Sequence, residues 1–114
     1  MTANRELESL EIPESFTVVH HEFFAYDPVT DYSIEENHLH LTEDLFQVIH
    51  EPTQLVIDLG WYGNKTDNRG EFVLNVIRND FWDEPLSKIF EKSQKEITRV
   101  LKKTLFAINA GLLD

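Results

Sequence analysis

The most regular hydrophobic patterns lie in the second half of the chain. Residues 55–62 (LVIDLGWY) and 72–77 (FVLNVI) are short runs rich in β-branched and aromatic side chains, which is typical of buried strands. Residues 63–70 between them are polar and have glycine at both ends, so we expect a loop joining two antiparallel strands. Pro85 then separates Trp82 from a short extended piece over 86–91.

A strong helical pattern follows these strands. Ser93-Gln-Lys-Glu96 is a capping box, in which the serine side chain accepts a backbone N–H that the first turn leaves unpaired. Apolar or small side chains then recur with helical spacing at Ile97, Val100, Leu101, Thr104, Leu105 and Ile108. The opposite face is basic, with Lys95, Arg99, Lys102 and Lys103. Gly111 marks the end of the predicted helix.

The first half is less regular. Residues 1–14 are acidic and predict either an extended arm or a frayed helix from Thr2. Residues 16–26 are rich in β-branched and aromatic side chains and predict a strand. Its doubled apolar pairs, 18–19 and 23–24, indicate burial on both faces or a β-bulge.

Residues 37–50 fit two periodicities. Polar His38, His40 and Thr42 alternate with leucines, as in a strand. A helix is supported instead by the spacing of Leu41, Leu45, Val48 and Ile49. Residues 51–54 (EPTQ) look like a hairpin connection to the strand at 55–62, so we favour a strand for 37–50.

These elements define the expected fold class. We predict an α+β fold, in which an antiparallel β-meander of four to five strands packs against a long C-terminal α-helix. At 114 residues, of which 41% are hydrophobic, the chain is long enough for one folded domain over 1–114.

Charge is distributed very unevenly along the chain. Residues 1–60 contain thirteen Asp and Glu but one basic residue, Arg5, for a net charge of −12, whereas residues 61–114 carry +1. Nucleic acid is a poor partner for such a protein, because phosphates require Lys and Arg. A basic protein surface is the natural complement.

Redox chemistry and membrane targeting are not indicated. There is no cysteine, so neither a disulfide nor a thiolate metal site is available. The amino-terminal region is acidic and has no long apolar stretch, so we expect neither a signal peptide nor a membrane interaction, and we expect a cytoplasmic location.

Catalytic patterns are weak. On a strand, His38 and His40 would project from one face roughly 7 Å apart, which suits two metal ligands, but no third ligand is defined. A small His-ligated metalloenzyme is therefore the least favoured function. No nucleophile elbow or phosphate-binding glycine loop is present, so we expect no enzyme activity and no cofactor.

We expect adjacent acids such as Glu35–Glu36 to be solvated surface pairs.

Aromatic residues cluster around the two central strands. We expect Trp61 and Trp82 to close one end of the hydrophobic core, because indole rings bury a large area. Tyr62 or Phe81 could instead anchor an interface beside the acidic residues.

Several segments together resemble bacterial immunity proteins, the inhibitors encoded beside polymorphic or contact-dependent growth-inhibition toxins. The resemblance covers about residues 43–110 and rests on the runs IDLGWY (57–62), FVLNVI (72–77) and WDEPL (82–86). It implies a non-enzymatic inhibitor that binds one cognate toxin domain tightly in the cytoplasm. Such toxins are often nucleases with a basic substrate cleft. We expect a monomer in a 1:1 complex with the toxin C-terminal domain.

The charge pattern suggests which residues contact such a partner. We predict a partner-binding set of Asp31, Glu35, Glu36, Glu43, Asp44, Glu51 and Tyr62, with Asp58 as a weaker candidate. All five histidines lie in the acidic half, and their protonation would change its charge from −12 to −7, so we expect weaker binding near pH 5. The alternative function is an acidic adaptor or chaperone-like module that holds a basic cellular protein without inhibiting an enzyme.

Overall fold

The five strands follow one another in the sheet in the same order as in the chain. The computed structural model describes residues 5–67, 69–78 and 82–112. The strands are β1 (Phe16–His21), β2 (Phe46–His50), β3 (Leu55–Asn64), β4 (Arg69–Arg78) and β5 (Ser87–Glu91). Every neighbouring pair is antiparallel, so the sheet is a simple meander. The helices are α1 (Ile34–His40) and α2 (Gln94–Asn109). The predicted α+β class, with a meander packed against the C-terminal helix, is confirmed.

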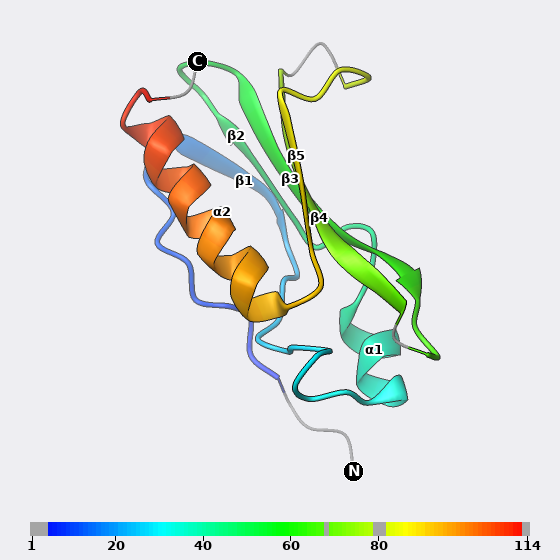
Figure 1. The fold of residues 1–114 in the computed structure, drawn as a ribbon. Coiled ribbons are helices and arrows are strands. Elements are labelled where there is room, and N and C mark those ends of the chain that lie inside the picture. Colours follow the sequence, from blue (N-terminus) through cyan, green and yellow to red (C-terminus); the bar gives the residue numbers. More distant parts are fainter. Residues whose placement is uncertain (1–4, 68, 79–81, 113–114) are drawn as a thin grey trace.

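Helix α2 lies across one face of the sheet, as Figure 1 shows. Its buried side chains pack on alternate residues of β3 and β4 within a single hydrophobic core, which includes Ile57, Leu59, Leu74, Ile97 and Leu101. Side chains on the other face of these strands point away from α2, because successive residues of a strand alternate. We call this the second face of the sheet. No helix within the described residues is long and apolar enough to cross a membrane.

The ends of α2 form as the sequence predicts. The Ser93 side chain accepts a hydrogen bond from the Glu96 backbone N–H at 3.3 Å, which is the serine half of the predicted capping box. The Glu96 carboxylate accepts hydrogen bonds from the Arg99 guanidinium at 3.1 and 3.3 Å. At the other end, Gly111 has φ +76°, and the backbone N–H of Leu112 donates to the Ala107 carbonyl at 2.9 Å. This is the 6→1 bond of a Schellman motif, which needs a residue that tolerates a left-handed conformation.

Strand β1 contains the predicted irregularity. The pairing register with β2 shifts between Val18 and His20, so Val19 is the extra residue of a bulge. Val18 and Val19 are 48% and 52% exposed. The bulge interpretation of the doubled pair is therefore correct, and burial on both faces is wrong.

The strand predicted over 37–50 is wrong for its first part. Residues 34–40 form α1, and the strand begins only at Phe46. The Ser33 side chain caps the helix by accepting the Glu36 backbone N–H at 3.2 Å. The helix forms because this cap stabilises its first turn and because buried side chains such as Asn37 hold one of its faces. The alternation of polar and apolar residues in the sequence did not reveal this buried face.

Residues 5–14 form an arm rather than a helix. Among the described residues of this segment, Leu7 forms an isolated bridge with Phe24, and the Glu8 backbone N–H donates to the Phe23 carbonyl at 2.7 Å. Figure 1 shows the arm passing alongside α2. A helical start at Thr2 lies outside the described residues.

The connections are mostly as expected. Residues 51–54 form the predicted turn between β2 and β3. Strands β3 and β4 extend further than predicted, to Asn64 and from Arg69, so the loop between them is shorter. Trp61 is buried at 2% exposure, as expected, but Trp82 is 46% exposed, so its predicted place in the core is wrong. Phe81 lies outside the described residues.

Candidate functional site

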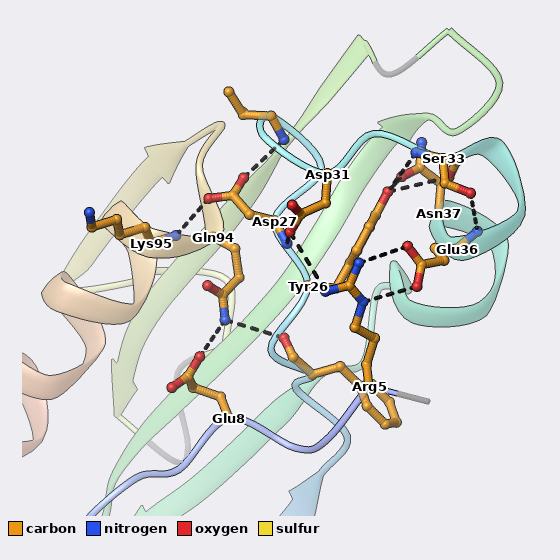
Figure 2. Close-up of polar contacts among 12 residues, drawn as sticks. Arg5, Glu8, Tyr26, Asp27, Asp31, Ser33, Glu36, Asn37, Gln94 and Lys95 are labelled. Atoms are coloured by element: carbon orange, nitrogen blue, oxygen red, sulfur yellow. Dashed lines mark hydrogen bonds and ion pairs between the residues drawn. The ribbon is translucent and has the colours of Figure 1, made fainter. Parts of the chain in front are cut away.

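Two of the predicted contact residues are already paired with a base of the same chain. The Arg5 guanidinium donates to both carboxylate oxygens of Glu36, at 2.9 and 3.1 Å (Figure 2). The Asp31 carboxylate lies 3.8 Å from the same guanidinium. Glu36 is only 7% exposed, and the hydrogen bond from Arg5 holds its pKa below the usual range. Glu36 is therefore too buried and too well paired to bind a partner's base without losing Arg5. Its role is to stabilise the fold.

Around this ion pair, the arm, α1 and the β3–β4 turn are joined by buried polar contacts. The Arg5 guanidinium also lies over the Tyr26 ring, 5.4 Å from its centroid. The Tyr26 hydroxyl donates to the Asn37 side-chain carbonyl at 2.5 Å, and the Asn37 amide donates to the Lys65 carbonyl at 2.8 Å. These contacts hold α1 in place although it is only seven residues long.

The start of α2 uses two further acids of the amino-terminal half (Figure 2). One Asp27 carboxylate oxygen accepts the Ser93 hydroxyl at 3.0 Å and the Lys95 backbone N–H at 3.2 Å. Burial alone would raise the pKa of Asp27, but these and other hydrogen bonds outweigh it and lower the pKa. The Gln94 amide donates to the Glu8 carboxylate at 2.7 Å. Part of the amino-terminal charge excess is therefore structural.

A different group of acids gathers on the second face of the sheet. Asp58 and Tyr62 both project from this face of β3, because they alternate with the core residues Ile57, Leu59 and Trp61. Glu43 and Asp44 lie just before β2 and approach the same region. We call Glu43, Asp44, Asp58 and Tyr62 the acidic cluster.

Gly60 allows the acidic cluster to form. The Trp61 backbone N–H donates to the Thr42 carbonyl at 2.8 Å, so the segment before β2 runs beside β3. A Cβ atom on Gly60 would collide with the backbone carbonyl of Glu43. Only glycine lets this segment pass so close to β3, which places the Glu43 and Asp44 side chains near Asp58 and Tyr62.

The pKa shifts of Asp58 and Tyr62 indicate that these acidic groups lie close enough to interact. Burial raises the pKa of Asp58, and the nearby Asp44 charge raises it further. Burial also raises the pKa of the Tyr62 hydroxyl, with smaller contributions from Asp58, Glu43 and Asp44. Within the described part of the chain, no Lys or Arg forms an ion pair with Glu43, Asp44 or Asp58. The cluster thus concentrates negative charge without a neutralising base.

A small depression adjoins the cluster. It has a volume of about 180 Å³ and is lined by His20, Asp44, Phe46, Gln47 and Asp58. The His20 ring nitrogen Nε2 lies 2.8 Å from the Asp44 backbone carbonyl and 3.1 Å from the Glu22 carboxylate. The depression offers acidic and amide oxygens to a ligand, and Tyr62 beside it is 41% exposed.

The other predicted contact residues lie elsewhere. Glu35 is exposed on α1. Glu51 lies at the β2–β3 turn, at the opposite end of β3 from Tyr62, and accepts the Thr17 hydroxyl at 2.6 Å. Of the predicted set, the structure brings Glu43, Asp44 and Tyr62 together around Asp58, the candidate given less weight. Sequence reasoning missed His20 and Gln47, whose positions depend on strand pairing.

The two histidines considered as metal ligands are on a helix rather than a strand. His38 is exposed, while the His40 ring stacks against Phe24 and Tyr26, with centroid distances of 4.6 and 5.7 Å. Burial lowers the pKa of His40. In the described residues, no group of three or more His, Asp or Glu side chains is arranged to hold a metal ion.

No protein-family profile matches this chain, and no curated protein or solved structure shows significant similarity to it.

Proposed function

We propose that this protein is an immunity protein that binds and neutralises a cognate bacterial toxin domain in the cytoplasm. The toxin is a nuclease with a basic substrate cleft, and the complex contains one copy of each protein. The acidic cluster is the centre of the contact surface, and Tyr62 is its aromatic anchor.

The observation that carries the proposal is the unneutralised charge of the acidic cluster. Elsewhere in the amino-terminal half, Glu36 and Asp27 are occupied by contacts within the protein. The carboxylates of Glu43, Asp44 and Asp58 have no such base among the described residues. Burial raises the pKa of Asp58, and the nearby Asp44 charge raises it further. A basic partner would relieve this repulsion, so binding gains energy that the free protein lacks.

A nuclease is a suitable partner because its cleft must attract phosphates with Lys and Arg. Carboxylates can occupy the positions that phosphate oxygens take in such a cleft. An exposed tyrosine beside charged groups is a common interface anchor, because its ring buries area and its hydroxyl forms a hydrogen bond.

Inhibition titration with the toxin domain encoded beside the gene for this chain tests the proposal. We expect complete inhibition at one equivalent of the native protein. The variant Asp44→Asn/Asp58→Asn should weaken binding about 30-fold or more, because it removes charges that the complex desolvates.

The matched control is Glu11→Gln/Glu14→Gln, which changes the net charge equally but lies on the arm. We expect it to reduce affinity less than about threefold, mainly through slower association. Equal weakening by both variants would mean that only net charge matters and would overturn the assignment of the cluster. Binding without inhibition would favour the acidic adaptor instead.

A further inference from the structure

A continuous row of polar residues crosses the second face of the sheet. The pairing register aligns one residue from each strand: His20, Gln47, Asp58, Asn75 and Lys88. Directly paired side chains on one face lie about 5 Å apart, so neighbours in this row are within reach of one ligand group. The depression beside His20, Gln47 and Asp58 lies at one end of the row.

Apolar residues flank the polar row. On one side, Ile49, Val56 and Ile77 are aligned across β2, β3 and β4. On the other side, Val73 pairs with Phe90, which is 51% exposed. Val56, Ile77 and Val73 are 0%, 3% and 6% exposed, so the accessible apolar surface beside the row comes from Ile49 and Phe90.

The middle of the row contains acceptors that the protein leaves unused. Asn75 is only 9% exposed, yet its side-chain oxygen Oδ1 has no hydrogen-bond partner among the described residues. Its cross-strand neighbour Asp58 is half-buried and has no ion-pair partner in the same part of the chain. A buried acceptor without a donor costs free energy, so both groups are better satisfied when a donor binds.

We propose that this row, with Asp44, is a binding site for an arginine side chain of the partner protein. This assignment deepens the proposed function and rests on it. The guanidinium pairs with the Asp58 and Asp44 carboxylates and donates to Gln47 and to Asn75 Oδ1.

Arginine fits this site better than lysine. The planar guanidinium has five N–H donors in a fixed fork, which can serve several acceptors at once. Lysine has a compact, strongly hydrated ammonium group, which loses more solvation in a half-apolar site. The bases at the ends of the row do not fill it: His20 contacts the Asp44 carbonyl and Glu22, and Lys88 is exposed on the edge strand β5.

A peptide titration of the whole chain tests this site without the toxin. The probes are acetyl-Gly-Arg-Gly-amide and acetyl-Gly-Lys-Gly-amide, followed by backbone amide NMR at low salt. We expect the arginine peptide to bind about fivefold more tightly or better, with shifts concentrated at Gln47, Asp58 and Asn75. Equal affinity for both peptides, shifts spread over the arm, or no binding at all would overturn the inference.

Variants make the result specific. Asp58→Asn keeps the side-chain shape and should weaken binding of the arginine peptide about tenfold. Asp44→Asn should weaken its binding to a smaller extent. Glu11→Gln should leave its affinity within about twofold. If Asp58→Asn and Asp44→Asn leave the selectivity for arginine unchanged, the site is wrong.

The peptide result separates this inference from the proposed function. Selective arginine binding without toxin inhibition would refute the immunity function and leave the site standing. Toxin inhibition without arginine selectivity would refute the site and leave the immunity function standing.

Discussion

The ion pair between Arg5 and Glu36 should account for much of the attachment of the amino-terminal arm. Replacing Arg5 by Met keeps the apolar stem but strands a carboxylate that is 7% exposed and accepts two hydrogen bonds, at 2.9 and 3.1 Å. Breaking a fully buried pair costs about 3–5 kcal/mol. Because the Arg5 side chain is 28% exposed, we expect a smaller loss, about 2 kcal/mol in the free energy of unfolding.

A double-mutant cycle measured by urea denaturation tests this reasoning. Arg5→Met/Glu36→Met strands no charge, so we expect it to lose less than Arg5→Met alone, by about 1 kcal/mol. Arg5 lowers the pKa of Glu36, so the ion pair contributes its full stabilisation at pH values above 4.5, the usual pKa of glutamate. This contribution is lost as the pH falls through the lowered pKa. Equal losses in the single and double variants at pH 7 would refute the role of the stranded charge.

Three further predictions concern the second face of the sheet. Gly60→Ala should lower the free energy of unfolding by about 2 kcal/mol, because the added Cβ meets the Glu43 carbonyl. Gly111→Ala, where the space is open, should lower it by about 1 kcal/mol, and urea denaturation compares the two variants. Asp58→Asn should raise the urea midpoint at pH 7, because a raised pKa means that the charged carboxylate of the wild-type protein destabilises the fold. This gain should vanish below pH 3.8, where the Asp58 carboxyl of the wild-type protein is neutral, like the asparagine side chain. Partner affinity at fixed salt should be weaker at pH 5 than at pH 7.5, because the raised pKa of Asp58 makes its carboxylate lose charge at a higher pH than an ordinary aspartate does. Calorimetry that shows equal affinity at both pH values would contradict this.

Much of the fold follows from local sequence signals. The capping-box serine and the apolar stripe of α2 agree with each other, and β3 and β4 are apolar runs in which residues 55–57 and 72–77 are buried consecutively. Such elements can be predicted because propensity, capping and burial all indicate the same structure.

Helix α1 was missed because its stability is largely non-local. The sequence Ser33-Ile-Glu-Glu36 has the form of a capping box, a signal that could have identified the start of the helix. However, the helix is short, and its buried face is held by residues distant in sequence, such as Arg5 and Tyr26. Isolated helices of this length are unstable, so periodicity alone gives no reliable answer.

The candidate site was only partly predictable for a related reason. Counting charges identified Glu43 and Asp44, but it gave equal weight to Glu36, whose charge Arg5 neutralises. The importance of Asp58 depends on its pairing with Gln47 and Asn75 across three strands. Which residues become neighbours depends on register, which the sequence of a single strand does not determine.

The most direct test of the central claim is hydrogen exchange of the free chain and of its complex with the basic toxin domain that we propose as its partner. The acidic cluster should be the contact surface, so binding should slow exchange most at residues 43–44, 58 and 62. The exposed basic side of α2, including Lys102 and Lys103, should be unaffected. Protection confined to α2 or to the arm beside it, with no change around Asp58, would contradict the account.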